Sequence, residues 1–310
     1  MSKKRQLKHT IFIACEGKNT ERIYFEALAE ETETDDRFSI TVYPDSQTHD
    51  PTTHAIGLVE EAQSRLEDFD EVWVVFDKNG YTKHPETFAA AATPKHGKTV
   101  NIAFSSIAFE QYILLHFTKS AEDYAKSKNI IDELHVNHYF DGYSKTAYQE
   151  TYSVLKDKTI VALENSAWLR HRLTNQGVLP GTAIYDTNPY TDVDKLVRRL
   201  LCIEEEIIWV SPKQTINLEN IEFTADVIDE KTITVNITNL GKQTFVYNAG
   251  NLSNHFYLLN TAREKTYFTI SNNTAFYPGN TKSFQLLTPS AMTGKHFNFV
   301  SNRYKIMMEI

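Results

Sequence analysis

The chain has 310 residues, of which 41% are hydrophobic and 23% are charged. This composition is that of an ordinary globular protein and excludes a disordered, collagen-like or coiled-coil chain. The length suits one large or two medium domains. The formal net charge is -8 at pH 7, so no chain-wide positive field attracts the protein to nucleic acid or to an anionic membrane. A phosphate-rich partner would need a local basic patch or a bound cation.

The two cysteines, Cys15 and Cys202, are too few for a disulfide framework or for a zinc site of their own. The basic start of the chain is followed by an apolar run, Ile11 to Cys15, that is too short for a secretory signal peptide. No run of about 18 apolar residues could span a bilayer. We therefore expect a cytoplasmic protein without membrane contact.

The first part of the chain alternates short β-branched runs with helical stretches, which predicts right-handed crossovers and a mostly parallel sheet with helices on both faces. The expected strands are 10–15, 38–43, 71–76 and 100–104, and helices are expected from Asn19 or Thr20 and over 50–66. Ligands of such sheets bind beyond the carboxyl ends of the strands. Glu16 and Asp77 stand at two of those ends.

A helical extension is expected next, over 108–117, 122–134, 146–172 and 191–205. From Ile207 onward about eight strand-like runs are separated by turn signals, among them Asn239-Leu-Gly241 and Pro278-Gly279. This pattern predicts an all-β, immunoglobulin-like sandwich. We place the boundary between the two domains after Cys202, giving domains of residues 1–202 and 203–310. Nearly all of the negative charge belongs to the first domain.

The carboxylates at the strand ends are candidates for a metal site. Glu16 precedes Gly17 and a helix start, where it could hold a hard cation or orient water beside a phosphate. Asp77 and Asn79 present oxygen atoms on one side of an extended segment, which suits magnesium or manganese better than zinc. Alternatively, Glu16 is a solvated loop residue, with Glu21 favouring the positive end of the helix, and Asp77 to Gly80 is an Asx turn.

Glu110 is the most unusual carboxylate in the sequence, because the predicted helix around it is apolar on nearly every side. An ionised side chain is costly there unless a cation or a donor meets it. His116 lies about 240° around that helix from Glu110 and is expected to be structural. Lys145 could reach a phosphate, although exposed lysines usually only solvate a surface. The short basic clusters 3–5, 170–172 and 198–199 could follow a nucleic-acid backbone or could simply be solvated.

Five motifs follow one another along the chain: Glu16-Gly-x-x-Thr20-Glu21-x-x-Tyr24-Phe25, Asp70-Glu-Val-Trp-Val-Val-Phe-Asp77, Phe109-Glu110-x-x-Ile-Leu-Leu-His116-Phe117, Tyr143-x-Lys145 and Asn188-Pro189-x-Thr191-x-Val193. Motifs in this order resemble those of the RloB family, Toprim-related proteins of bacterial restriction and abortive-infection loci. The resemblance covers Ile11 to about Leu200.

The resemblance implies a Toprim-like first domain in which Glu16 is the first-strand acid and Asp77 is the leading aspartate of a magnesium site. Asn79 occupies the place of the second aspartate, so the site keeps one oxygen ligand and loses one negative charge. Glu110 and Lys145 lie on motifs specific to RloB and are implied as an extra acid and a phosphate contact. The predicted catalytic set is therefore Glu16, Asp77, Glu110 and Lys145. Its predicted metal ligands are Glu16, Asp77, Asn79 and Glu110.

Our leading hypothesis is a nuclease of antiviral defence that uses Mg²⁺ or Mn²⁺ to hydrolyse phosphodiester bonds in RNA, such as tRNA, or in DNA. The alternative is a catalytically inactive Toprim-like sensor or binding module of a defence complex. Asn79, which stands in place of the second aspartate, favours this alternative. A phosphotransfer or ligase-like enzyme is a third hypothesis without a nucleotide-binding loop to support it. The sandwich would recognise a trigger, a protein partner or the substrate, and a homo-oligomer is compatible with the sequence.

Overall fold

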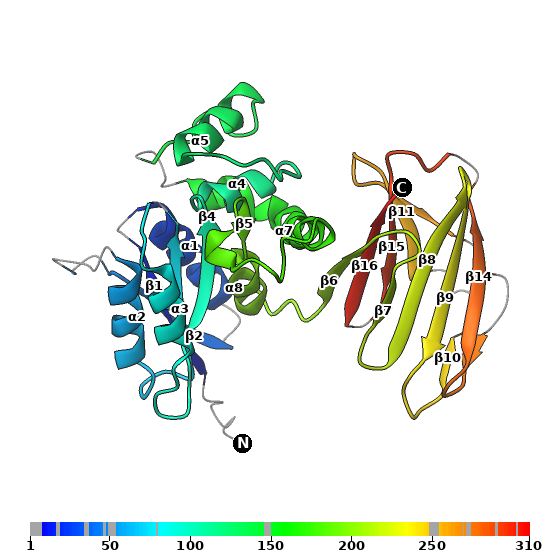
Figure 1. Ribbon diagram of the computed structural model, residues 1–310, viewed down its shortest axis with the longest axis horizontal. Helices are drawn as coiled ribbons and strands as arrows, with labels where there is room; N and C mark the ends of the chain where they lie inside the picture. Colours follow the sequence, from blue (N-terminus) through cyan, green and yellow to red (C-terminus); the bar gives the residue numbers. More distant parts are fainter. Residues whose placement is uncertain are drawn as a thin grey trace, which may run out of the picture. The chain divides into compact units, whose positions relative to one another are not determined.

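The computed structural model describes residues 8–16, 19–33, 37–45, 48, 54–78, 80–145, 150–247, 254–268, 270, 274–288, 291–301 and 303–310. The chain divides into two compact units, Met1–Ile203 and Glu204–Ile310. The first unit is mixed α/β and the second is built from β-sheets (Figure 1).

A five-stranded sheet in the order β2-β1-β3-β4-β5 forms the centre of the first unit. All neighbouring strands are parallel except β4 and β5. The predicted parallel sheet is therefore confirmed, with one short antiparallel edge strand that was not predicted. The strands are β1 (His9–Cys15), β2 (Phe38–Tyr43), β3 (Glu71–Asp77), β4 (Asn101–Ser106) and β5 (Tyr190–Thr191).

The side on which successive strands join the sheet changes at β1: β2 lies on one side of β1, while β3 and β4 lie on the other. The switch point is therefore between β1 and β3. Right-handed crossovers then put the β1–β2 helix on one face of the sheet and the next two helices on the opposite face. The contacts agree, because α1 packs with β2 and α8, whereas α2 packs with β1, β3 and α3. These helices are α1 (Thr20–Glu33), α2 (Ala55–Ser64), α3 (His84–Ala92) and α8 (Val193–Leu200).

The helical extension is more broken than the sequence predicts. The helix expected over 108–117 shortens to α4 (Glu110–Leu115), and the one expected over 122–134 begins only at Ser127. A 3-10 turn at Lys156–Lys158 interrupts the long helix expected over 146–172. The remaining helices are α5 (Ser127–Val136), α6 (Thr151–Leu155) and α7 (Thr159–Asn175), with a second 3-10 turn at Ile184–Asp186.

The second unit contains sheets of five, four and two strands, in the orders β12-β11-β15-β16-β6, β14-β9-β8-β7 and β10-β13. Strand pairs are antiparallel apart from β16 and β6, which are parallel. One hydrophobic core joins the sheets, and in it the Phe223 ring of β8 stacks on Phe299 of β15 at 5.3 Å. The strands are β6 (Glu206–Val210), β7 (Thr215–Asn217), β8 (Ile221–Asp229), β9 (Thr232–Asn239), β10 (Phe245–Tyr247), β11 (Phe256–Leu259), β12 (Lys265–Tyr267), β13 (Thr274–Phe276), β14 (Thr281–Leu287), β15 (His296–Val300) and β16 (Tyr304–Glu309).

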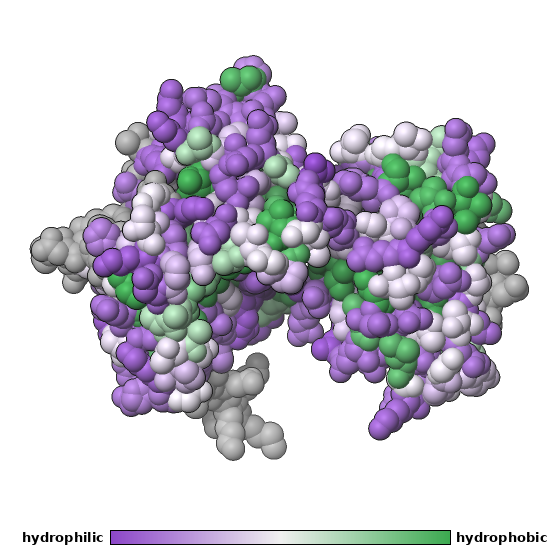
Figure 2. Space-filling view, in the orientation of Figure 1, coloured by the Kyte–Doolittle hydropathy of each residue, from purple (hydrophilic) through white to green (hydrophobic). Residues whose placement is uncertain are grey.

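Within the described residues, no helix combines the length and the apolar character that crossing a bilayer requires. Hydrophilic side chains cover much of the visible face, with isolated apolar groups between them (Figure 2). Both cysteines are free thiols, and Cys15 is fully buried in β1. Burial raises the pKa of the Cys15 thiol well above its ordinary value, so this residue is an inert part of the core.

Candidate functional site

The carboxyl ends of β1 and β3 bring Glu16 and Asp77 together. Residues Ile11–Cys15 and Val72–Asp77 are almost completely buried, as expected for central strands that are covered on both faces. Glu16 follows the apolar run of β1 and Asp77 ends that of β3. The two strands are neighbours, with Cys15 opposite Val75. Because the strand order reverses here, the acids stand at the switch point where open α/β sheets bind ligands.

Two hydrogen bonds, one from the backbone and one to the side chain, hold Glu16 over the end of β3. The backbone N–H of Glu16 donates to the carbonyl of Val75 at 2.9 Å, which continues the ladder by one residue. The backbone N–H of Asp77 donates to Oε2 of Glu16 at 3.3 Å. The carboxylate of Glu16 is thereby fixed beside Asp77, whose own side chain is only 5% exposed.

Glu110 supplies a third carboxylate, from the first turn of α4. Its side chain is 1% exposed, as the apolar sequence around it predicts. The hydroxyl of Tyr143 donates to Oε1 at 2.8 Å, and Nζ of Lys145 lies 3.4 Å from Oε2. These two groups are the donor and the cation that an ionised buried carboxylate needs. The Tyr143-x-Lys145 motif thus closes over Glu110, and 44% of the Lys145 side chain remains exposed.

Glu21 is a fourth carboxylate that the predicted site set lacks. It lies in the first turn of α1, where the sequence suggested only a helix-dipole partner. Burial, followed by the charges of Glu110 and Glu16, raises the pKa of Glu21 to about 8. The clue in the sequence was its position five residues after Glu16, at the start of the helix that leaves β1. Hydrophobic periodicity alone could not reveal which way that first turn faces.

The electrostatics of the cluster are those of crowded acids with too little positive charge. Burial, together with the charges of Glu21 and Glu16, raises the pKa of Asp77 well above its ordinary value. Burial also raises the pKa of Glu16, opposed by the Asp77 hydrogen bond and by the attraction of His54 and Lys145. Four carboxyl groups therefore share mainly one ammonium group. Burial lowers the pKa of Lys145, but Glu110 and Asp77 raise it more, so this ammonium stays charged.

The chemistry of these donors fits a hard divalent cation. All four acids offer oxygen atoms, the ligands that Mg²⁺ and Mn²⁺ prefer. Oδ1 of Asp77 is buried without a hydrogen-bond partner, which leaves it available to an ion. Asn79, a predicted ligand, lies outside the described residues. Among the residues that the structure does describe, no three His, Cys, Asp or Glu side chains form a ready metal shell. Glu16 and Asp77 are the pair best placed to hold an ion. Oε1 of Glu110 accepts a hydrogen bond from Tyr143, and its Oε2, which has no hydrogen-bond partner among the described residues, lies 3.4 Å from Nζ of Lys145.

Two of the basic clusters have roles inside the fold. Arg170 makes paired 2.7 Å hydrogen bonds to both carboxylate oxygens of the buried Asp194, and it also donates to the carbonyl of Thr191. Arg199 pairs with Glu71 at 2.8 Å. Arg170 therefore has a structural role, because three of the five N–H groups of its guanidinium donate to Asp194 and Thr191. Contact of these clusters with a nucleic-acid backbone stays a prediction. Cluster 3–5 lies outside the described residues.

His116 is structural, as expected. It is 1% exposed, and its Nδ1 lies 3.0 Å from the carbonyl oxygen of Tyr112. Burial lowers the pKa of His116 to about 4, so the ring is neutral at physiological pH.

Comparisons with known proteins agree with the sequence motifs. The RloB-like protein family matches residues 11–200, a stretch that contains all four carboxylates, Tyr143 and Lys145. No match to the chain is found among curated proteins.

The solved structures that match this chain have low TM-scores, so they do not identify its fold. The archaellum periplasmic stator protein FlaG from Sulfolobus acidocaldarius is 13% identical over 31% of this chain and 93% of its own, with a TM-score of 0.20. A putative alpha-N-acetylgalactosaminidase from Bacillus halodurans is 11% identical over 91% of this chain and 75% of its own, with a TM-score of 0.19. The family match covers more than half of the chain, and the chain therefore belongs to the RloB-like protein family.

Proposed function

We propose that the first unit is a divalent-metal-dependent nuclease that hydrolyses phosphodiester bonds in RNA or DNA. One observation carries the proposal: four carboxyl groups and one lysine gather at the switch point of the parallel sheet. Burial raises the pKa of Glu16, Glu21 and Asp77, and the charges of neighbouring acids raise it further in Glu21 and Asp77. Such a cluster lacks positive charge, and a hard cation supplies it.

In this proposal Glu16 and Asp77 hold the ion, with Asn79 as a further oxygen donor. A bound Mg²⁺ or Mn²⁺ would lower the pKa of an attacking water and offset the charge of the phosphate. Glu16 is fixed by the backbone of Asp77 and can accept a proton from that water. Glu110 would join as a ligand only if Lys145 moved away from it.

Lys145 is the proposed contact to the phosphate. Its ammonium is partly exposed and anchored on one side by Glu110, which Tyr143 holds in turn. A cation positioned by a buried acid can hydrogen-bond a phosphate oxygen at little cost in ordering. The cluster would therefore bind the scissile phosphate between the ion and Lys145.

Finer aspects of the fold and role belong to the same proposal. An acid after the first strand and another ending the third, on a parallel sheet, support a Toprim-like first unit. The packed sheets of the second unit support an immunoglobulin-like recognition domain. The role in antiviral defence, with tRNA among the candidate substrates, follows from the family resemblance.

A cleavage assay tests the proposal. Purified protein is incubated with labelled RNA and DNA in the presence of Mg²⁺, Mn²⁺ or EDTA, beside Glu16→Gln and Asp77→Ala. We expect metal-dependent cleavage that falls at least 100-fold in both variants, since each would remove charge from the ion site. Glu30→Gln changes an exposed acid of α1 and is the matched control. Equal cleavage by all four proteins would refute the assignment of the site.

A second candidate function is a binding module without catalysis. The observation that favours it is the ammonium of Lys145, which already offsets part of the negative charge of the cluster. Calorimetry separates the two candidates. A module would bind nucleic acid or a protein with no heat of Mn²⁺ binding, whereas the nuclease requires Mn²⁺ binding that is lost in Asp77→Ala.

A further inference from the structure

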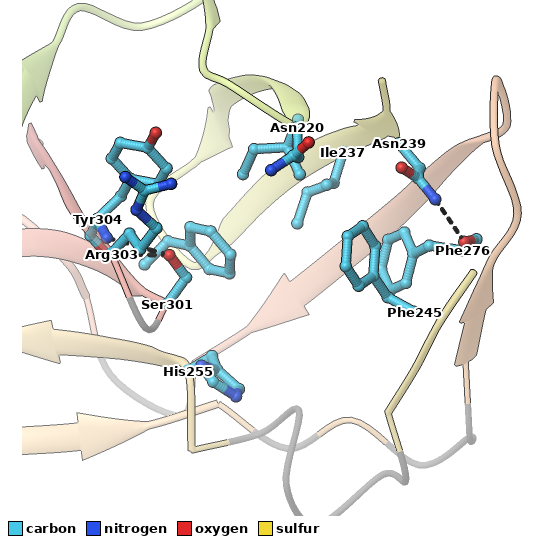
Figure 3. Close-up of a pocket in the computed structure, with 11 residues that line it drawn as sticks. Asn220, Ile237, Asn239, Phe245, His255, Phe276, Ser301, Arg303 and Tyr304 are labelled. Atoms are coloured by element: carbon cyan, nitrogen blue, oxygen red, sulfur yellow. Dashed lines mark hydrogen bonds between the residues drawn. The ribbon is translucent and has the colours of Figure 1, made fainter. Parts of the chain in front are cut away.

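The second unit, which lies outside the family match, contains a cavity of about 220 Å³. Its walls come from the ends of several strands, so it opens at one end of the packed sheets (Figure 3). Ile237 of β9, Phe276 of β13 and Phe299 of β15 form the buried part of the lining. Asn220, His255 and Arg303 bring polar groups to the same cavity.

The volume of the cavity limits the size of the ligand that it can hold. An engineered apolar cavity of about 150 Å³ is enough to bind benzene. A cavity about half as large again accommodates one substituted ring or one fused pair of rings, but not an extended peptide. The aromatic lining offers edge-to-face or offset contacts to such a ring.

The polar chemistry of the buried end is already satisfied. The side-chain amide of Asn239 donates to the carbonyls of Gln243 and Phe276, both at 2.7 Å, and its oxygen accepts from the N–H of Gly241 at 2.9 Å. The buried end therefore offers few free donors or acceptors to the polar edges of a nucleobase. Burying such edges without partners is costly, which favours a hydrocarbon-like ring such as phenyl or indole.

A positive charge lines the exposed part of the cavity. The guanidinium of Arg303 is exposed and pairs with Glu219, which is also exposed. Exposed ion pairs contribute little to stability, so a ligand carboxylate can replace Glu219 as the partner of Arg303. Guanidinium and carboxylate then match in a two-point hydrogen bond.

From the lining, the volume and this charge, we propose that the cavity binds an aromatic hydrocarbon ring that carries a carboxylate. The ring lies on Phe245, Phe276 and Phe299, and the carboxylate pairs with Arg303. Two sources share this chemistry: a free aromatic acid, and the C-terminal aromatic residue of a partner chain. The site is independent of the proposed nuclease, because none of its residues belongs to the carboxylate cluster.

The test uses the full chain and four probes: N-acetyl-tryptophan, its amide, a hexapeptide ending in tryptophan, and AMP. Binding is followed by calorimetry and by the methyl NMR signals of Ile237, which lines the cavity. We expect the acid to shift the Ile237 signals and to bind roughly tenfold or more tightly than the amide, because the amide cannot form the charged pair. A stronger affinity for the hexapeptide than for the free acid identifies a chain end as the source. Similar affinities identify a small molecule.

Variants of the charged pair sharpen the test. Arg303→Gln should remove the difference in affinity between acid and amide, while Glu219→Gln should strengthen binding of the acid by freeing the guanidinium. Arg263→Gln, a similar change on the turn between β11 and β12, is the matched control. Without any probe, Ile237 methyl signals at the same positions as in the wild type show that the variants fold.

Three results would overturn the proposal. These are equal affinities for acid and amide, tighter binding of AMP than of N-acetyl-tryptophan, and an Ile237 spectrum that no probe changes at about 1 mM, the weak end of specific binding. None of the measurements uses cleavage, so the nuclease proposal can fail or succeed separately.

Discussion

The backbone N–H of Asp77 donates a hydrogen bond to Oε2 of Glu16 across 3.3 Å, which ties the side chain after β1 to the last residue of β3. The bond orients one acid with the backbone of the other, so the separation of the two side chains is set by the spacing of paired strands. An amide oxygen can accept the same bond. Glu16→Gln therefore removes the charge while keeping the position, and it isolates the electrostatic role of Glu16.

Asp77→Asn should make the metal-free protein more stable and should make it insensitive to divalent ions. The substitution removes a buried charge that its neighbours disfavour. We expect a rise in Tm of about 2–4 °C in EDTA. The wild type should gain about 2.7 kcal/mol from an ion at 100 times its Kd, and the variant should gain nothing. Thermal unfolding with EDTA and with Mg²⁺ measures both effects, and Glu30→Gln should behave as wild type.

Stability of the metal-free protein should fall as the pH rises from about 4.5 to about 8. In this range the unfolded chain has released the proton of Glu21, whose ordinary pKa is 4.5, but the folded protein still holds it because the folded pKa is about 8. The folded state then binds more protons than the unfolded state, so the free energy of unfolding decreases with pH. Glu16 and Asp77 shift in the same direction.

Urea unfolding at several pH values in EDTA measures this slope. Glu21→Gln should flatten it, and saturating Mn²⁺ should flatten it in the wild type. A slope of the opposite sign would contradict the raised pKa of the cluster.

Tyr143→Phe should destabilise the protein by about 2 kcal/mol. The change removes the hydroxyl that donates to Glu110 and leaves a buried charged acceptor with one partner fewer. Urea unfolding of Tyr143→Phe, Glu110→Gln and the double variant gives the coupling energy. We expect the double variant to be more stable than the sum of the single effects predicts. Strict additivity would show that the hydrogen bond contributes nothing.

Arg170→Met should unfold the first unit more easily without a specific effect on nucleic-acid affinity. It leaves the carboxylate of Asp194 buried and unpaired, which costs about 3–5 kcal/mol. Burial lowers the pKa of Arg170 but Asp194 raises it more, so the guanidinium stays charged. Affinity is compared at a temperature where the variant is folded. A loss of affinity there would restore Arg170 to the nucleic-acid surface.

The sequence predicts the frame of the site well, because its strands are continuous apolar runs that stop at an acid. Glu16 and Asp77 could be placed at one sheet edge from this pattern and from the parallel alternation alone. The burial of Glu110 was also predictable from its apolar neighbours. Its partners Tyr143 and Lys145 are more than 30 residues away in the sequence, and only the fold brings them together.

Other features depend on tertiary contacts that a single sequence does not encode locally. A helix was expected over 191–205, but α8 begins only at Val193, and Thr191 lies in β5, where its hydroxyl is 2.9 Å from that of Ser105. It still accepts a 3.4 Å hydrogen bond from the backbone N–H of Val193, so strand pairing and helix entry share one residue. The 3-10 turn at Lys156–Lys158 contains no proline or glycine that would predict a break. The hydrophobic periodicity continues across it, so one long helix was predicted there.

The pairing of β16 with both β15 and β6 sets the order in which the second unit can form during synthesis. β6 enters this unit at Glu206, yet its only partner among the described strands ends at Glu309. About 100 residues must emerge before β6 acquires a neighbour, and contacts of such long range form slowly. The parallel sheet of the first unit is complete by Thr191. The acidic cluster can thus fold at the ribosome while β6 still lacks a partner strand.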